Sequence, residues 1–382
     1  MLDIIFYDVE VFAYDWTVTF KSLRTGEYTF IHNNNYEVKK FMENPHMILA
    51  GWNNKMYDDY ILLAMMVGAD PQTLKRLNDW IIVEHKLPWE FPFLQGHWKN
   101  FDSFDLRDDL YKALSLKEAE GNMRMNIEES SISFDIDRPL TPEEVEEIRL
   151  YNRSDVDATE RVFHARKSNY LRPKVEVGKM IGLSGQESLR LTNGKLTAKV
   201  LNAEKRTWND ERQYKIPKNI NIDRLPREIL EFYLRMYHDI SDDELFHGPF
   251  DDEQKKIRFY FKGSEVVSKG KKLKREELDE LGVTHEWYDG KLIIYGKNAE
   301  YVYGFGGVHA GISNYISESS EDKLILLWDV RSLYPSIMIE FDFLSRNTPM
   351  RDRFREIYYE RIDAKAKGDD VKSDSLKLVL NR

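Results

Sequence analysis

The segment LDIIFYDVEVF (residues 2–12) decides the first part of the fold. Its nearly continuous run of aromatic and branched apolar residues predicts a buried β-strand. Because side chains alternate between the two faces of a strand, Asp8 and Glu10 lie on the same face near its end. Such a pair is common by chance in a chain with 66 acidic residues, so its meaning depends on the rest of the sequence.

The residues after this strand predict an α/β domain. Strand-like runs at residues 14–20 and 27–31, with Thr25-Gly26 as a turn between them, predict a three-stranded meander. Further segments predict a helix at 36–42, a strand at 46–52, a helix at 58–67 and a strand near 101–106. Thr141-Pro142-Glu143-Glu144 has the pattern of a capping box, which predicts a long helix from there to about residue 169.

The second half of the chain gives a less regular pattern. Arg172-Pro173 predicts a break after the long helix. Beyond it the sequence predicts helices near 226–238, a lysine-rich strand and turn region at 259–277, a glycine-dense segment at 301–309, a core strand at 324–330 (LILLWDV), and helices at 351–367 and from 373. A mixed α+β region therefore follows the first domain.

The composition excludes several classes of protein and site. The chain has 382 residues, of which 42% are hydrophobic and 32% charged, which is enough for two or more domains. The absence of cysteine excludes disulfides, thiolate nucleophiles and cysteine-ligated metals, so any metal must be bound by oxygen or histidine. No apolar run reaches the roughly 18 residues of a membrane span, and the start lacks a signal-peptide pattern. We therefore expect a soluble cytoplasmic protein without a membrane partner.

The charge is distributed unevenly along the chain. Residues 1–160 carry a formal net charge of −14, and residues 161–382 carry +4. An acidic first domain is expected where several carboxylates hold divalent cations, and a mildly basic second half suits a phosphate backbone. Two ordinary solvent-exposed surfaces that differ by chance would give the same two net charges.

Further residues can join Asp8 and Glu10 in one site. Tyr57-Asp58 lies at a strand-to-helix junction, shortly after Asn53-Asn54. Tyr151 and Asp155 are four residues apart on the long helix and share a face. Two divalent ions about 3.5–4 Å apart can activate a water and stabilise the leaving oxygen of a phosphodiester, and they need this number of oxygen ligands.

With these residues, the first 170 residues resemble the proofreading exonuclease domain of DNA polymerases, a ribonuclease H-like fold of the DEDDy type. Its D-x-E motif matches Asp8 and Glu10, its Asn-containing (Phe/Tyr)-Asp motif matches Tyr57-Asp58 with either Asn53 or Asn54, and its Tyr-x-x-x-Asp motif matches Tyr151 and Asp155. Asp59 competes with Asp58, and Asp157 with Asp155. We choose Asp58 because it directly follows the aromatic residue, and Asp155 because it shares the face of the tyrosine.

The resemblance implies roles for these residues. Asp8, Glu10 and Asp155 would ligate two Mg²⁺ or Mn²⁺ ions, Asp58 would hold the second ion directly or through water, and Tyr151 would orient the attacking water. Tyr57 and Asn53 or Asn54 would grip the unpaired 3′ nucleotides of single-stranded DNA. Ser115-Leu116 resembles the family's motif that touches the 3′ end, although Ser-Leu before a helix is usually just a cap.

The string Asp329–Ile337 (DVRSLYPSI) resembles motif A of family B DNA polymerases. The resemblance implies that Asp329 binds a metal, that the Ser332 and Leu333 amides meet the phosphates of a dNTP, and that Tyr334 packs under the deoxyribose. Lys377-Leu378-Val379-Leu380-Asn381 resembles the opening of motif B, which implies that Lys377 binds the triphosphate and that Asn381 lies near the incoming base pair. Residues 303–307 (YGFGG) loosely resemble the segment that joins the exonuclease and polymerase domains.

The metal-binding aspartates of motif C do not follow Asn381. The resemblance therefore predicts the N-terminal part of a phage-like family B DNA polymerase, acting on primer–template DNA, for example in a phage-infected bacterial cell. Its expected parts are an exonuclease domain (1–170), a connecting region (171–300) and an incomplete palm and fingers (301–382). A second polypeptide carrying motif C and a truncated chain both remain open.

Two rival functions are a stand-alone DNA exonuclease and a non-catalytic DNA-binding subunit of a replication complex. The first leaves DVRSLYPSI without a purpose. The second leaves the set of four carboxylates and a tyrosine without one.

Overall fold

The structure is a computed structural model, and it describes residues 3–110, 114–204, 221, 224–233, 257–297, 299–304, 307–312 and 314–381. The chain forms two compact units: unit 1 comprises Met1–Glu204 and Leu344–Arg382, and unit 2 comprises Lys205–Phe343. The domain limits expected at residues 170 and 300 do not coincide with these units. The functional division of the chain therefore stays a prediction.

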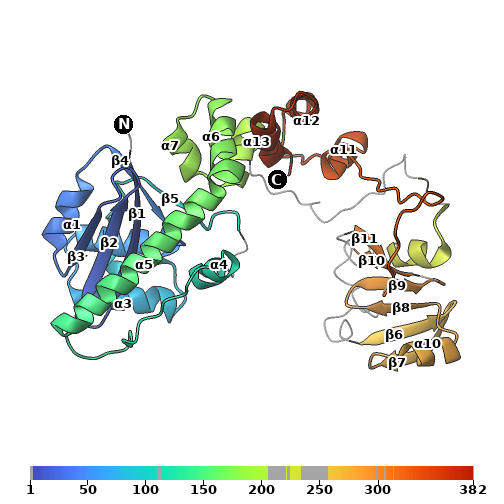
Figure 1. Cartoon of the computed structure of the whole chain (residues 1–382), viewed down its shortest axis with the longest axis horizontal. Helices are drawn as coiled ribbons and strands as arrows, with labels where there is room; N and C mark the ends of the chain where they lie inside the picture. Colours follow the sequence, from blue (N-terminus) through green and yellow to red (C-terminus); the bar gives the residue numbers. More distant parts are fainter. Residues whose placement is uncertain are drawn as a thin grey trace. The chain divides into compact units, whose positions relative to one another are not determined.

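Unit 1 contains a five-stranded sheet with β1 (Asp3–Val11) at its centre (Figure 1). The antiparallel meander of β1, β2 (Trp16–Ser22) and β3 (Tyr28–His32) confirms the prediction from the sequence. On the other side, β4 (Met47–Gly51) and β5 (Ser103–Asp105) run parallel to β1, which gives the order β3-β2-β1-β4-β5. The pairing of β1 with β4 ends at Phe6 and Ala50, so β1 extends beyond β4 at the end that carries Asp8 and Glu10.

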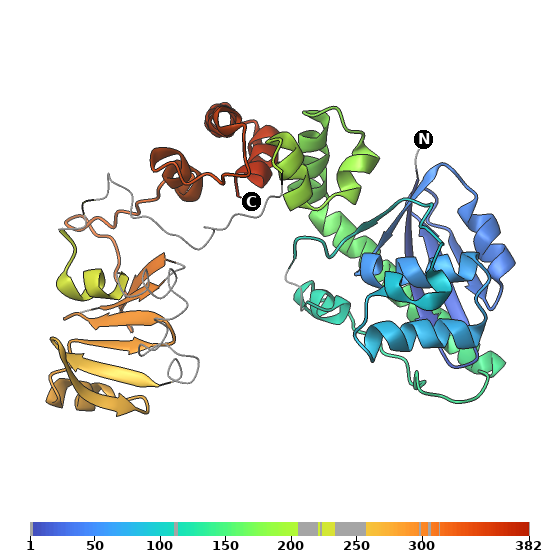
Figure 2. The same cartoon turned by 180° about the vertical axis from the view of Figure 1, so that it is seen from behind.

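Helices pack on both faces of this sheet, as the apolar run of β1 predicts. One face packs against α1 (Asn35–Met42), α2 (Asp58–Met66) and α3 (Pro71–Ile82), which Figure 2 shows in blue to cyan from behind. Across the other face runs the long helix α5 (Pro142–Arg166), with the short α4 (Leu116–Asn122) beside it (Figure 1). Along β1, Tyr7 belongs to the first core, whereas Phe6 packs with Phe163 of α5 in the second.

The expected break at Arg172-Pro173 is wrong. The chain passes from α5 through a π-helical turn (Lys167–Leu171) directly into α6 (Arg172–Lys179). Pro173 lies in the first turn of α6, where its missing N–H costs no intrahelical hydrogen bond. The start of α5 is as predicted, because Thr141 and Glu144 form both hydrogen bonds of a capping box.

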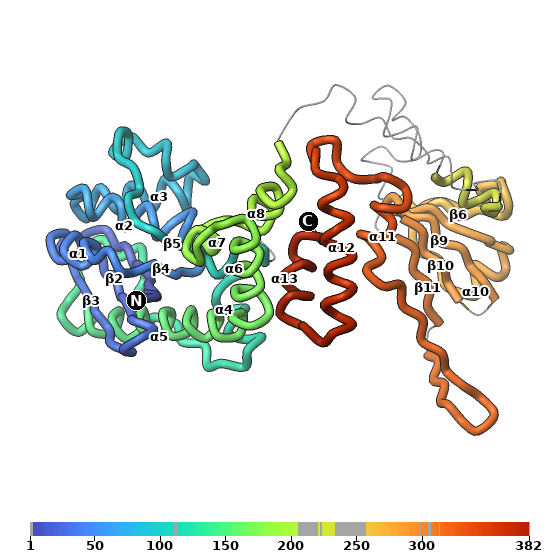
Figure 3. The backbone as a smooth tube through the Cα atoms, turned by 90° about the horizontal axis from the view of Figure 1, so that it is seen from above, coloured from blue at the N-terminus to red at the C-terminus, as the bar shows by residue number. Residues whose placement is uncertain are grey.

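A group of helices completes unit 1. It consists of α6, α7 (Gly185–Arg190), α8 (Asn193–Val200), α12 (Arg351–Ala366) and α13 (Asp370–Leu380). Figure 3 shows that α13 lies beside α12, and α13 also contacts α6 and α8. The two predicted C-terminal helices are confirmed, and α13 begins three residues early because the Asp369 side chain caps it.

The short 3₁₀ turns are η1 (Asn54–Met56), η2 (Pro88–Glu90) and η3 (Pro92–Leu94).

Unit 2 is built around a six-stranded antiparallel sheet. Its strands are β6 (Arg258–Lys262), β7 (Glu265–Gly270), β8 (His285–Tyr288), β9 (Lys291–Tyr295), β10 (Glu300–Gly304) and β11 (Gly307–Gly311), in the order β11-β10-β9-β8-β6-β7. Helix α10 (Arg275–Glu280) follows β7, and residues 227–233 are helical, with Phe232 packed against Trp287. The predicted lysine-rich strand and turn region is thus confirmed. Residues 234–238 of the expected helix lie outside the described residues.

The expected core strand at residues 324–330 is wrong. These residues form no strand, and their apolar side chains are exposed, Leu327 to 97%. A strand needs neighbours for its backbone N–H and C=O groups, and no described residue pairs with this segment. The following helix, α11, spans Leu333–Glu340. Among the residues that the structure describes, no helix has the length and apolar composition needed to cross a membrane.

Candidate metal centre

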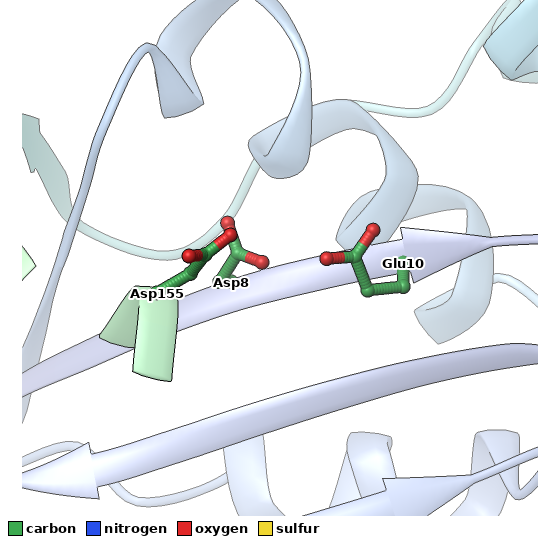
Figure 4. Close-up of side chains that lie close together, drawn as sticks. All are labelled: Asp8, Glu10 and Asp155. Atoms are coloured by element: carbon green, nitrogen blue, oxygen red, sulfur yellow. The ribbon is translucent and has the colours of Figure 1, made fainter. Parts of the chain in front are cut away.

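Three carboxylates meet where α5 crosses β1. Asp8 and Glu10 project from the same face of β1, and Asp155 approaches them from α5 (Figure 4). One carboxylate oxygen from each residue lies within 4.8 Å of the other two. The shared face of Asp8 and Glu10 and the inclusion of Asp155 agree with the expectations from the sequence.

The electrostatics of this cluster favour a cation. Burial, followed by repulsion from Glu10, Asp58 and Asp155, raises the pKa of Asp8 well above its usual value. Burial and neighbouring carboxylates likewise raise the pKa of Glu10 to about 8. Carboxylates that repel one another at low dielectric gain stability from a proton or a cation. All three ligands offer oxygen, the donor that Mg²⁺ and Mn²⁺ prefer, so the residues fit such an ion.

Asp58 is a fourth carboxylate of this group. It is the first residue of α2 and is buried, and burial raises its pKa to about 8. Its charge also raises the pKa of both Asp8 and Glu10. Asp58 is not among the three residues whose oxygens lie within 4.8 Å of one another, so its place is beside that cluster.

The two competing aspartates face elsewhere. Asp59 accepts hydrogen bonds from several side chains, among them Tyr7 and Lys99. Asp157 is bound by the Lys21 ammonium and the Tyr28 hydroxyl. Neither Asp59 nor Asp157 belongs to the group of three carboxylates whose oxygens lie within 4.8 Å of one another.

Tyr151 lies one helical turn before Asp155 on α5. Burial and the charge of Asp155 raise the pKa of its phenol above the usual value. The hydroxyl therefore stays protonated at neutral pH and can donate a hydrogen bond beside the cluster.

Two residues at the cluster were not found from the sequence. Lys117 Nζ lies 2.5 Å from Asp155 Oδ1, 3.5 Å from Glu120 Oε1 and 5.0 Å from the centre of the Tyr151 ring. Asn152 donates from Nδ2 to Asp8 Oδ2 at 2.6 Å. Asn152 could have been found from its spacing of three residues before Asp155, which places the two on one face of α5. No sequence signal distinguishes Lys117 from the other lysines, because α4 meets α5 only in the folded chain.

The residues expected to bind single-stranded DNA lie at the same end of the sheet or on α4. Asn53 has a left-handed backbone (φ 58°), and its N–H donates to Asp105. In contrast, Asn54 is fully buried and donates to Asp59. The Tyr57 hydroxyl donates to Asn78 Oδ1 at 2.7 Å. Ser115 caps α4 through a capping box with Glu118, and Leu116 begins that helix.

The residues that resemble polymerase motifs fall in both units. In unit 2, Asp329 is exposed, and Ser332 has a left-handed backbone (φ 53°) just before Leu333 and Tyr334 begin α11. In unit 1, Lys377 and Asn381 are exposed at the end of α13. Lys377 and Asn381 are joined by a backbone hydrogen bond, as their expected helical spacing requires.

Comparisons with known proteins show a distant likeness to solved structures. No protein-family model matches the chain, and no curated protein matches it. Among solved structures, it is similar to the family B DNA polymerase of the hyperthermophilic archaeon Pyrobaculum calidifontis, at 12% sequence identity and a TM-score of 0.41. The match covers 100% of this chain and 46% of that polymerase, so the chain spans about half of the polymerase's length.

Proposed function

We propose that unit 1 is a 3′→5′ exodeoxyribonuclease of the DEDDy proofreading type, in the N-terminal part of a phage-like family B DNA polymerase. The observation that carries this proposal is the meeting of Asp8, Glu10 and Asp155 within 4.8 Å. The sheet order β3-β2-β1-β4-β5, with helices on both faces, supports a ribonuclease H-like domain.

The cofactor proposed is Mg²⁺ or Mn²⁺, with two ions in the site. Asp8, Glu10 and Asp155 would ligate the metals, and Asp58 would hold the second ion directly or through water. When bound, such ions activate a water molecule and stabilise the leaving oxygen of a phosphodiester.

The surrounding side chains would prepare this site for cleavage. Asn152 fixes the orientation of the Asp8 carboxylate through its hydrogen bond. The protonated phenol of Tyr151 would donate to the attacking water and orient it toward the phosphorus. Lys117 adds a positive charge beside Asp155, where it can also attract a phosphate oxygen.

The unpaired 3′ end of DNA would be held by residues next to the carboxylates. Tyr57 would stack on a base, and Ser115 and Leu116 would contact the terminal nucleotides. Of the two asparagines, Asn53 is the candidate for a hydrogen bond to DNA, because Asn54 is fully buried.

The polymerase function is proposed on the string at residues 329–337. Asp329 would bind a metal, the amides of Ser332 and Leu333 would bind the phosphates of a dNTP, and Tyr334 would lie under its sugar. The start of α11 supports this role, because the first amides of a helix attract anions. Lys377 and Asn381 would bind the triphosphate and the base pair.

A second polypeptide carrying motif C is proposed to complete the polymerase site. The exposed apolar residues at 324–328 support contact with another polypeptide surface.

The test of the exonuclease is digestion of a 5′-labelled single-stranded oligonucleotide with Mg²⁺ or Mn²⁺. The unsubstituted chain should shorten it stepwise from the 3′ end, and Asp8→Ala/Glu10→Ala should not. Asp157→Ala is the matched control, since Asp157 lies on the same helix as Asp155 but is bound by Lys21 and Tyr28. DNA binding without cleavage by any variant would instead favour the non-catalytic DNA-binding subunit.

A further inference from the structure

Four side chains from separate segments of unit 1 bind the carboxylate of Asp59, which is only 1% exposed. Tyr7 Oη on β1 and Asn54 Nδ2 on η1 donate to Oδ1, at 2.5 and 3.1 Å. Lys99 Nζ and Ser103 Oγ, the latter on β5, donate to Oδ2, at 2.5 and 2.6 Å. Each carboxylate oxygen of Asp59 therefore accepts two hydrogen bonds, so we do not assign Asp59 as a metal ligand.

The position of these residues in the chain connects this network to the candidate metal centre. Tyr7 directly precedes Asp8, and Asp59 directly follows Asp58. The Tyr7–Asp59 hydrogen bond therefore joins β1 to the first turn of α2 at the residues next to two site carboxylates. Because side chains alternate along a strand, Tyr7 and Asp8 project from opposite faces of β1.

We propose that Asp59 is the positioning residue that holds Asp58 in place beside Asp8 and Glu10. This inference rests on the proposed function. Asp58 lies at a helix start, close to Asp8 and Glu10, whose carboxylates it repels. The charges of Asp59 and Asp105 also raise the pKa of Asp58, so its position has to be held by hydrogen bonds. The hydrogen bonds of Asp59 resist that repulsion, since they fix the first turn of α2 to β1 and β5. Lys99 balances the buried charge of Asp59 at a distance of 2.5 Å.

Asp15 provides a matched comparison within the same unit. It is also a buried carboxylate, and it accepts hydrogen bonds from His32, Asn33 and the backbone N–H of Leu140. None of these partners adjoins a proposed metal ligand in the sequence. Substitution of Asp15 therefore reports the effect of losing a buried carboxylate on stability alone.

The experiment is Mn²⁺ titration of the full chain, with free Mn²⁺ measured by electron paramagnetic resonance and folding measured by circular dichroism. Asp59→Asn should weaken Mn²⁺ binding by roughly 10- to 100-fold, as the loss of groups that orient metal ligands usually does. Asp15→Asn should lower the melting temperature but change the Mn²⁺ affinity less than twofold. Tyr7→Phe and Ser103→Ala each remove one donor and should weaken Mn²⁺ binding to a smaller extent, in chains that stay folded.

The outcomes separate this inference from the proposed function. If the unsubstituted chain binds Mn²⁺ and all the Asp59-network variants bind it equally well, Asp59 is only structural and the inference is overturned. If the unsubstituted chain binds no Mn²⁺, the proposed function is overturned and the inference falls with it.

Discussion

Lys117 Nζ lies 2.5 Å from Asp155 Oδ1, and this ion pair joins the first turn of α4 to the middle of α5. Burial raises the pKa of Asp155, and the Lys117 ammonium opposes that rise. Lys117 thus offsets part of the negative charge of the carboxylate cluster. Among the ion pairs of the described residues, none involves Asp8 or Glu10.

Substitution of Lys117 should therefore change the affinity for divalent cations. Lys117→Met removes a positive charge beside Asp155, so the Mg²⁺ concentration at half-saturation should fall by roughly three- to tenfold. Lys21→Met is the control, because Lys21 pairs with Asp157 and Glu160 on the same helix. Competition of Mg²⁺ against bound Mn²⁺ measures the effect, and weaker Mg²⁺ binding by Lys117→Met would contradict the charge argument.

Tyr151→Phe should separate metal binding from chemistry. The hydroxyl is proposed to orient the attacking water, so its loss should lower kcat by roughly 100-fold, the lower end of what proton-handling groups contribute. Mn²⁺ affinity should stay within twofold, since Tyr151 is not a proposed ligand. Tyr28→Phe is the matched control. The Tyr28 hydroxyl donates a hydrogen bond to Asp157, which lies on the same helix as Asp155 but outside the carboxylate cluster. Equal kcat values for Tyr151→Phe and the unsubstituted chain would remove Tyr151 from the mechanism.

The cluster should destabilise the metal-free protein as pH rises. The pKa of Glu10 is about 8 in the folded chain against an ordinary value of 4.5. The folded state therefore holds a proton that the unfolded state releases, and the stability present below pH 4.5 is lost as pH rises through 8. Glu10→Gln cannot lose a proton, so it removes this loss of stability. Its melting temperature at pH 8 should rise by about 2–4 °C for each kcal/mol of unfolding free energy that is regained.

Glu144→Gln is a control of opposite sign for that experiment. A hydrogen bond from Arg138 and the backbone N–H of Thr141 lower the pKa of Glu144 to about 2. Its stabilising effect is present above pH 4.5 and is lost as pH falls through 2, so Glu144→Gln should lower the melting temperature at pH 8. Saturating Mg²⁺ should shrink the difference between Glu10→Gln and the unsubstituted chain. A Glu10→Gln melting temperature below that of the unsubstituted metal-free chain would contradict the prediction.

Substitutions of Asn53 and Asn54 should affect different properties of the protein, DNA binding and stability respectively. Asn53 has a positive φ, so Asn53→Gly should fold normally but weaken binding of single-stranded DNA. Asn54 is buried and bonded to Asp59, so Asn54→Ala should lower the free energy of unfolding by about 1–3 kcal/mol. Fluorescence anisotropy of a labelled oligonucleotide and thermal unfolding measure the two effects. Unchanged DNA binding by Asn53→Gly would exclude Asn53 as a contact.

The sequence predicts the parts of unit 1 that depend on local pattern. The apolar run around Asp8 and Glu10 indicates a strand buried on both faces, and the capping box at Thr141 starts α5 where expected. The four-residue spacing of Tyr151 and Asp155 then puts both side chains on one side of that helix. The sequence pattern does not specify which buried face of β1 packs against α5. In the structure it is the face of Phe6, which contacts Phe163.

Features that depend on tertiary contacts were not predicted. The ion pair of Lys117 with Asp155 and the hydrogen bonds to Asp59 form between segments that meet only in the folded unit. The run at residues 324–330 has the composition of a core strand, but composition does not supply a neighbouring strand, and the segment is exposed. The sequence predicts a helix break at Arg172-Pro173, because it does not show that a new helix begins at Arg172.

The division of unit 1 between two distant parts of the chain has a consequence for its synthesis. The ribosome releases α6 and α8 before unit 2, whereas α13, which packs against both helices, emerges after it. Contacts across so long a loop form late, because closing the loop costs entropy. The sheet and α5 are fully synthesised once the chain reaches Arg166, so they do not depend on these late contacts. The carboxylate cluster can therefore assemble on the nascent chain while the helices that finish its unit are still unsynthesised.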